Sequence, residues 1–150
     1  MWSPKGMHPI VTITGSHQRT CVFGTLTIDG RQLFRQFDKF NQDTFLKYLK
    51  EIIRKFRKVI MFTDRAVQHY RSDKVKSYLY KNKEIIRIEY FPKGSPEFNP
   101  VEECWKQGKE DLLVSKYYPR FTNLKTTIAE YYRTKRFSLD IVKYLSRNVS

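Results

Sequence analysis

The most constraining feature of the sequence is the short apolar segment Val59–Thr63, which a helical pattern and then a second apolar segment follow. Five residues are too few for a core helix, and the lack of polar alternation is typical of a strand covered on both faces. Ser72 can cap a helix over 72–81, and the next strand is expected over 85–91. A strand, a helix and a strand in this order predict a right-handed crossover between parallel strands. The chain is therefore expected to be an α/β domain.

Antiparallel strands are expected before this unit. Strand-like patterns occupy residues 9–14, 20–28 and 32–37. Asp29-Gly30 between the last two is typical of a tight hairpin turn. Helical spacing runs over 43–56, with an apolar side and a basic side, and further helices are expected over 99–115, 123–133 and 138–147. Together the patterns predict a mixed sheet with flanking helices.

Composition restricts the partners of the chain. Its 150 residues are 40% hydrophobic and 15% aromatic, enough for the core of one domain. Lysine and arginine total 29 against 15 acidic residues, a net charge of +14 that is spread through the predicted helices. Such a surface favours polyanionic partners. We find neither a run of about 18 apolar residues nor a signal-peptide pattern, so we expect no membrane partner and a cytoplasmic location.

The two cysteines are predicted to be core residues. Cys21 lies in a strand-like segment and Cys104 in a predicted helix. Two lone thiols without a Cys-x-x-Cys pair argue against a zinc site or a disulfide framework. Free cysteine is usually buried as a small apolar side chain.

Two carboxylates are the candidates for chemistry. Asp64 follows the segment Val59–Thr63, and ligand sites of open α/β sheets form beyond the carboxyl ends of strands. Glu102 lies in the first turn of the helix that Asn99 is expected to cap. In so basic a chain, this pair resembles half of a divalent-metal site for phosphodiester chemistry. Each also has a structural explanation, Asp64 as a turn former and Glu102 as the capping-box partner of Asn99, and the residues alone leave both explanations open.

A two-metal site normally needs a third carboxylate on a neighbouring strand. Before Asp64, the aspartates at 29, 38 and 43 are expected in the hairpin turn, a loop and a helix start. None of them is placed on a strand. The sequence therefore predicts an incomplete enzyme.

Three basic residues are candidate contacts to nucleic acid. Lys106 and Lys109 follow Glu102 by four and seven residues, which puts them on its side of the helix. They would meet phosphates beside a metal there, although a solvated basic helix face explains them equally well. Arg65, next to Asp64, is the third candidate. His69 receives no role, because a single histidine between a loop and a helix is more often a structural hydrogen-bond partner.

Two segments resemble the signatures of mariner-like insertion-sequence transposases of the DDE superfamily. Residues 63–69, Thr-Asp-Arg-Ala-Val-Gln-His, resemble their Asp-Asn-Ala-x-x-His signature. Residues 95–105, Ser-Pro-Glu-Phe-Asn-Pro-Val-Glu-Glu-Cys-Trp, match their Ser-Pro-Asp/Glu-Leu-Asn-Pro-Ile/Val-Glu-x-x-Trp motif. Residues 2–6, Trp-Ser-Pro-Lys-Gly, are similar to the Trp-Ala-Pro-Lys-Gly segment of the same superfamily. The order of elements agrees over about residues 1–116.

The resemblance implies an α/β fold with a ribonuclease H-like mixed sheet and flanking helices. It also implies a two-metal active site in which Asp64 is the second acid and Glu102 the third, in preference to Glu97 or Glu103. Mg²⁺ or Mn²⁺ is the implied cofactor, expected as a two-ion site only in the complete domain, and DNA is the implied partner. The complete enzyme would cut the transposon end with water and then use the freed 3′-hydroxyl to attack target DNA.

The departures from the family pattern imply a partial domain. Arg65 replaces the family's Asn, and the first acid would lie on a strand before Met1, as would the family's DNA-reading helix-turn-helix region. Residues 1–150 then form a single partial catalytic domain, inactive alone, that lacks its first, central strand. We expect two open strand edges, costing about 1–3 kcal/mol per unsatisfied backbone group. Such edges need an upstream transposase segment, or a second copy of the chain, as a partner.

Two other functions stay open at this point. Basicity alone supports a non-catalytic DNA-binding remnant that interferes with or regulates an intact relative. The implied fold also suits another ribonuclease H-like nuclease, such as a junction resolvase or an RNA-degrading enzyme.

Overall fold

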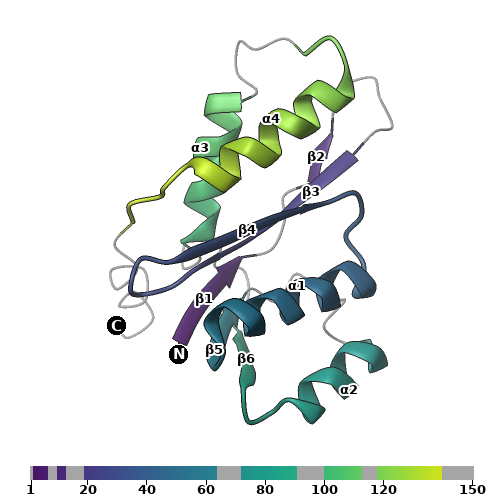
Figure 1. Ribbon diagram of the computed structural model, residues 1–150, viewed down its shortest axis with the longest axis vertical. Helices are drawn as coiled ribbons and strands as arrows, with labels where there is room; N and C mark the ends of the chain where they lie inside the picture. Colours follow the sequence, from purple (N-terminus) through teal and green to yellow (C-terminus); the bar gives the residue numbers. More distant parts are fainter. Residues whose placement is uncertain are drawn as a thin grey trace.

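The computed structural model describes residues 2–6, 10–12, 19–63, 72–90, 100–112 and 118–139. In this part of the chain, one mixed six-stranded sheet lies between two layers of helices (Figure 1). The strands are β1 Trp2–Gly6, β2 Ile10–Thr12, β3 Arg19–Leu26, β4 Gln32–Phe37, β5 Val59–Thr63 and β6 Ile86–Tyr90. The helices are α1 Gln42–Phe56, α2 Asp73–Lys81, α3 Val101–Leu112 and α4 Phe121–Thr134.

The sheet joins an antiparallel hairpin to a parallel pair. β4 pairs along one side of β3, and β1 and β2 share the other side, both antiparallel to β3. β1 then pairs in parallel with β5, and β5 pairs in parallel with β6. The parallel arrangement predicted from the strand–helix–strand pattern of 59–91 is confirmed.

The central strand corrects one expectation. We expected the hairpin and β5 each to present an open edge, but β1 lies between them and pairs with both β3 and β5. Residues 2–6 carry no strand signal of their own, because Pro4 has no amide hydrogen to donate and Gly6 disfavours extended backbone. The pairing partners of β1 lie about 20 to 60 residues away, so local pattern carries no sign of it.

Side-chain caps define where two helices begin. Asn41 Oδ1 accepts hydrogen bonds from the backbone N–H groups of Asp43 and Thr44, both at 3.0 Å, and the Asn41 N–H donates to Thr44 Oγ1 at 3.0 Å. This capping box starts α1 at residue 42, one position earlier than expected. Ser72 Oγ accepts from the Val75 N–H at 3.2 Å, which confirms the predicted cap of α2.

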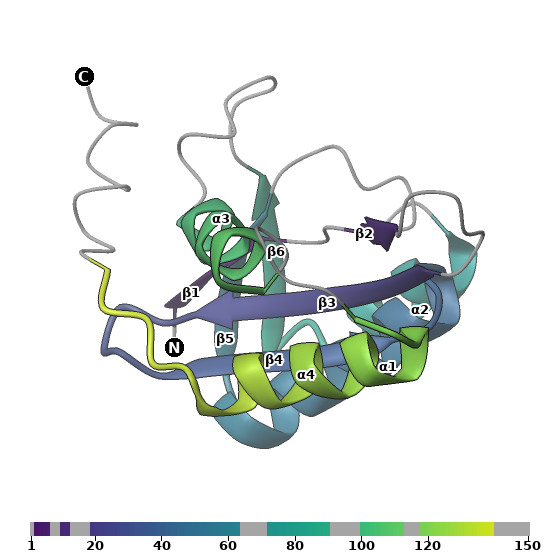
Figure 2. The same cartoon turned by 90° about the horizontal axis from the view of Figure 1, so that it is seen from above.

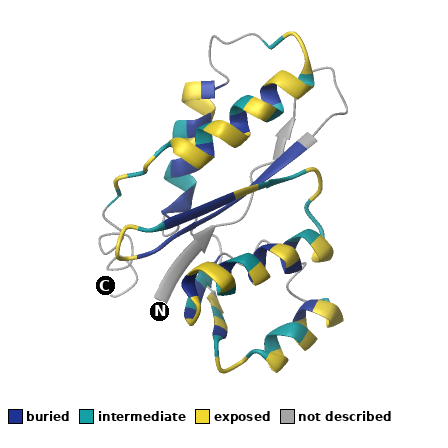
Figure 3. Ribbon diagram, viewed as in Figure 1, coloured by how far each residue is buried: buried dark blue, intermediate teal, exposed yellow. Residues whose placement is uncertain are grey.

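The β3–β4 hairpin is covered on both faces. In Figure 2, α4 lies along the hairpin, and in Figure 3 most of the hairpin is coloured as buried. Side chains on one face of the hairpin pack in the core beneath α1; they are Cys21, Phe23 and Leu33, which contact the cluster of Leu49, Ile52, Val59 and Met61. Side chains on the opposite face pack in the core beneath α3 and α4; they are Val22, Leu26 and Phe34, which belong to the cluster of Trp105, Leu124, Ile128 and Tyr132. Cys21 and Cys104 are both buried, as predicted.

Two of the three helices expected in the carboxyl-terminal third of the chain lie among the described residues. The helices expected over 99–115 and 123–133 appear as α3 and α4, the first beginning at Val101 and the second two residues early at Phe121. Residues 138 and 139 are not helical, and the rest of the expected helix 138–147 lies outside the described residues, as does the loop 93–98. No helix in the part of the chain that the structure describes is long and apolar enough to span a membrane.

Candidate active site

The structure describes the frame of the candidate site and one of its two acids. β5 ends at Thr63, which is fully buried, and Asp64 is the next residue along the chain. Asp64, Arg65 and His69 lie outside the described residues, as does the expected cap Asn99. Glu102, Lys106 and Lys109 are described, all on α3.

Strand register places α3 at the edge of the sheet where β5 ends. Pro4 of β1 pairs with Phe62 of β5, and the two strands are parallel, so Gly6 lies at the same edge as Thr63. Gly6 in turn pairs with Gly24 of β3. A methyl group at Gly24 would lie 2.8 Å from Trp105 Cη2, so the indole rests directly on this point of the sheet. Trp105 is one helical turn beyond Glu102, and α3 contacts β1, with its first turn beside the arrowhead of β1 (Figure 1). The first turn of α3 therefore lies at the edge of the sheet where β1 and β5 end.

Glu102 is the described acid of the site. It is half-buried in the first turn of α3, where the helix dipole favours an ionised carboxylate. Its neighbour Glu103 is also half-buried and accepts a hydrogen bond from Gln107 Nε2 at 3.4 Å. An ionised carboxylate is the ligand type that Mg²⁺ prefers. Among the described residues no group of three His, Cys, Asp or Glu side chains could hold a metal, and Asp64, the other candidate ligand, lies outside those residues.

Buried side chains anchor the helix that carries Glu102. Trp105 meets Phe34 and Tyr132 edge to face, each with a centroid separation of 5.8 Å. Cys104 is fully buried beside them, and burial, then the charge of Glu103, raises the pKa of its thiol well above the usual range. Cys104 is therefore a neutral packing residue and takes no part in metal binding.

Two glycines, neither of them among the predicted site residues, allow α3 to pack closely against the sheet and against α4. Gly24 admits Trp105 to the sheet, and Gly108 admits Tyr132 of α4, whose hydroxyl donates to the Cys104 carbonyl at 3.5 Å. A methyl group at Gly108 would lie 2.7 Å from Tyr132 Cζ. The only sequence signal was a glycine inside a strand pattern and a glycine inside a helical pattern, each a sign of close approach.

Replacing Gly108 with alanine is expected to destabilise the fold by about 1–3 kcal/mol, because the overlap with the Tyr132 ring outweighs the helix propensity gained. The measurement is the free energy of unfolding in urea. In a Tyr132→Leu background the same substitution should cost clearly less, because the far end of the ring is gone. Equal costs in both backgrounds would contradict the described contact.

The two lysines of α3 remain suitable for a phosphate. Lys106 and Lys109 are exposed, and neither forms an ion pair with a described residue. Helical spacing puts both on the side of Glu102. The structure thus brings Glu102, Lys106 and Lys109 together on one helix face beside the end of β5.

Residues 1–125 match the sequence model of a protein family described as DDE superfamily endonuclease. The chain belongs to the DDE superfamily endonucleases. No related sequence was found among curated proteins.

Solved structures share the fold of this DDE chain. The catalytic domain of Mos1 mariner transposase superposes with a TM-score of 0.67 at 12% identity, covering 99% of this chain and 74% of that one. The HTLV-2 integrase catalytic core domain in complex with magnesium, in its dimeric form, superposes with a TM-score of 0.56 at 10% identity, covering 87% and 83%. A simian T-cell lymphotropic virus intasome, solved with PP2A regulatory subunit B56 gamma, gives a TM-score of 0.56 at 11% identity, covering 91% and 50%. The predicted ribonuclease H-like α/β fold class is confirmed.

Proposed function

We propose that this DDE domain is the carboxyl-terminal catalytic segment of an insertion-sequence DNA transposase, which cuts DNA and transfers strands when complete. The observation that carries the proposal is the position of α3. Its first turn, with Glu102, stands where β5 ends and Asp64 follows. The end of β5, which Asp64 follows in the sequence, and the helix turn that carries Glu102 thus lie at one edge of the sheet, and this supports the pairing of the two acids that we propose.

The residues of the chain divide into two roles. Asp64 and Glu102 would hold Mg²⁺ or Mn²⁺, and the fold neighbour from HTLV-2, solved with magnesium, supports this choice of ion. When bound, the ions lower the barrier to in-line displacement at phosphorus by stabilising the attacking and leaving oxygens. Arg65, Lys106 and Lys109 would hold the DNA backbone beside the acids, and Trp105 keeps Glu102 in place through its packing on Gly24.

The first acid is proposed to come from an upstream transposase segment. β1 occupies the middle of the sheet, and its five residues, Trp-Ser-Pro-Lys-Gly, include no carboxylate. We therefore propose that the chain alone does not cut DNA. The HTLV-2 cores were solved in dimeric and trimeric forms, which supports self-association as a further property of the complete enzyme.

The test is nicking by the 150-residue chain with and without a candidate upstream segment. The segment is chosen from the DNA just before the Met1 codon, read in three frames for a strand-like stretch that ends in Asp. Linear duplex, branched DNA and RNA–DNA hybrid are compared in Mg²⁺ and in EDTA. We expect nicking of linear duplex only with both the segment and the metal. Equal nicking by the chain alone contradicts the incomplete site, and a preference for branched DNA or hybrid favours another nuclease.

The acid-free middle strand also favours a second function, a non-catalytic DNA-binding remnant that regulates an intact relative. Such a remnant would bind DNA of any sequence with a Kd of about 10⁻⁴–10⁻⁶ M that weakens steeply with salt. Magnesium-dependent turnover excludes this function.

A further inference from the structure

Gln32 organises a set of cationic side chains at the outer edge of β4. Its side chain is 6% exposed, and its Nε2 donates to the Lys135 carbonyl at 2.7 Å while its Oε1 accepts from the Phe137 N–H at 3.2 Å. The two residues that flank Arg136 are thus held by one buried amide. The Phe137 ring packs against Phe34, with centroids 5.3 Å apart. The backbone on both sides of Arg136 is therefore held in place, although it lies beyond the end of α4.

A second cation reaches the same residue from α1. Lys55 Nζ donates to the backbone carbonyl of Gln32 at 2.6 Å. Lys55 Nζ and Arg31 Cζ also lie over the same Phe56 ring, 5.7 and 5.2 Å from its centroid. Three cationic residues from separate segments of the chain thus lie near Gln32, namely Arg31, Lys55 and Arg136. We call their side chains the Gln32 cluster.

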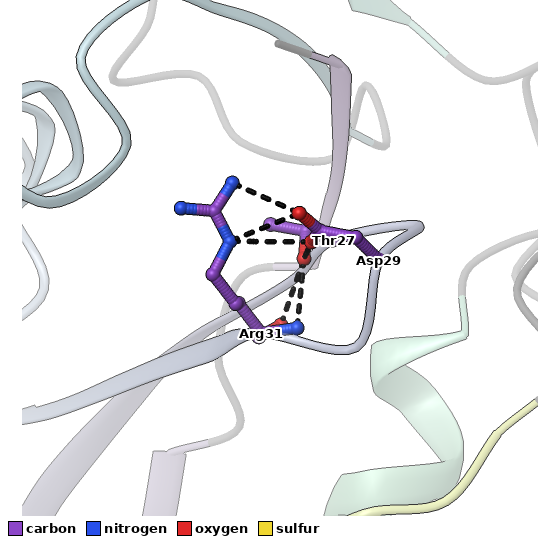
Figure 4. Close-up of polar contacts among 3 residues, drawn as sticks. All are labelled: Thr27, Asp29 and Arg31. Carbon is purple, nitrogen blue, oxygen red and sulfur yellow. Dashed lines mark hydrogen bonds and ion pairs between the residues drawn. The ribbon is translucent and has the colours of Figure 1, made fainter.

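The negative charges beside the Gln32 cluster are already engaged. Arg31 Nε donates to both carboxylate oxygens of Asp29, at 3.2 Å to Oδ1 and 3.1 Å to Oδ2, and Arg31 Nη2 lies 3.1 Å from Oδ2. The Thr27 hydroxyl also donates to Asp29 Oδ1 (Figure 4). These hydrogen bonds, the one from Arg31 first, lower the pKa of Asp29 to about 2. Glu51 pairs with Arg35 at 2.7 Å.

Positive charge is left over at this edge. Neither Lys55 nor Arg136 forms an ion pair with a carboxylate in the described part of the chain. Withdrawal from water, and then the charges of Arg35, Arg136 and Arg31, lower the pKa of Lys55. Mutual repulsion of this kind is relieved by a bound anion.

We propose that the Gln32 cluster binds a backbone phosphate of DNA, as a contact separate from the candidate metal site. β3 runs antiparallel to β1, so the turn that follows it, with Arg31, extends toward the amino ends of β1 and β5. Glu102 stands at the opposite, carboxyl ends. A DNA duplex bound both at the Gln32 cluster and beside Glu102 would extend along the sheet from the amino ends of β1 and β5 to their carboxyl ends. The choice of DNA as the source of the phosphate rests on the proposed function; the anion site itself rests on the geometry.

The test is duplex binding in EDTA, so that catalysis plays no part. Arg136→Gln removes one charge from an exposed position outside regular structure, and fluorescence anisotropy is measured at several KCl concentrations. Affinity is expected to fall about three- to tenfold, and the slope of log K against log salt to fall by about one. Arg120→Gln is the matched control, because Arg120 is exposed at the start of α4, about 20 Å from its end. Equal losses in the two variants would show diffuse attraction and overturn the site.

Cations at the edge of β4 could also serve only to prevent pairing with another strand. A variant that disturbs the Gln32 cluster without changing its charge separates this role from phosphate binding. Gln32→Met removes both hydrogen bonds that place Arg136 and leaves every charge present. We expect at least a twofold loss of duplex affinity at constant salt, with thermal unfolding confirming a folded protein. Gln32→Leu, which also leaves every charge present, is the second variant if Gln32→Met does not fold. A folded variant of either kind with unchanged affinity would contradict the proposal.

Inorganic phosphate distinguishes the two sources of the anion. Chloride is replaced by phosphate at constant ionic strength, and the thermal midpoint and duplex affinity are measured for the parent chain and for Arg136→Gln. For a DNA site, phosphate competes weakly and the variants still differ in duplex affinity. If phosphate raises the midpoint of the parent only, while duplex affinity is the same in both, the site takes a small anion and the DNA assignment is wrong. Failure of nicking leaves these results unaffected, so the two proposals fail separately.

Discussion

Replacing Glu102 with glutamine is expected to lower metal-dependent nicking by about a thousandfold or more when the chain is supplied with the proposed upstream segment. A loss of this size corresponds to about 4 kcal/mol of transition-state stabilisation, the range expected when a metal loses an anionic ligand. Glutamine keeps the shape of the side chain and can still make the capping-box hydrogen bond at a helix start. The substitution therefore removes the proposed metal ligand and keeps the capping hydrogen bond that would be the structural role of Glu102.

The matched control is Glu103→Gln, one residue away in the same turn of α3 and equally half-buried. Its nicking rate should stay within about threefold of the parent, because its described partner is Gln107 rather than a site residue. Asp64→Ala should be as damaging as Glu102→Gln, since both acids are needed for one pair of ions. Single-turnover nicking of a labelled duplex gives the rates, and thermal midpoints check the fold. Parental nicking by Glu102→Gln or Asp64→Ala would remove that residue from the site.

Replacing Trp105 with alanine is expected to cost about 3–5 kcal/mol of folding free energy, the usual range for truncating a buried tryptophan. The indole is 3% exposed and fills the space between Gly24, Phe34 and Tyr132. A domain of this size has about 5–15 kcal/mol in total, so most of the stability is at risk. Urea unfolding followed by circular dichroism measures the effect.

Tyr80→Ala serves as the control for Trp105→Ala. Tyr80 is 71% exposed, and its ring meets only the ammonium of Lys83 at 4.5 Å among the described cation contacts. Its loss should cost less than about 1 kcal/mol. A Trp105→Ala variant with a loss as small as that of Tyr80→Ala would mean that α3 does not pack on the sheet as described.

Elements with a strong local pattern were predictable from the sequence. The spacing of apolar residues predicted α1 and β5 to within one residue, and Ser72 was identified as the cap of α2. In each case the signal lies within the element itself, as hydrophobic periodicity or a capping side chain. The hairpin turn at Asp29-Gly30 was predicted for the same reason, since Gly30 adopts a positive φ of 89° that glycine tolerates.

Features that depend on distant partners were not predictable. β1 has the composition of a turn, and only its pairing with β3 and β5 makes it a strand. The Gln32 cluster is another case, because the hydrogen bonds of Gln32 reach Lys135 and Phe137, over 100 residues away. At the candidate site, the motif of residues 95–105 predicted Glu102 as the acid of α3. The motif does not say at which edge of the sheet this helix begins, and that follows from the register of β1 with β5 and β3.

The two-sided burial of the β3–β4 hairpin has a consequence for how the chain tolerates insertions. A one-residue shift of β3 would turn Cys21 and Phe23 toward α3 and α4 and Val22 and Leu26 toward α1, and the same shift of β4 would exchange the faces of Leu33 and Phe34. Both cores would be lost together, whereas a one-sided sheet would lose only one. Added residues should therefore be accepted in the exposed turn at 28–30 and rejected within the hairpin strands.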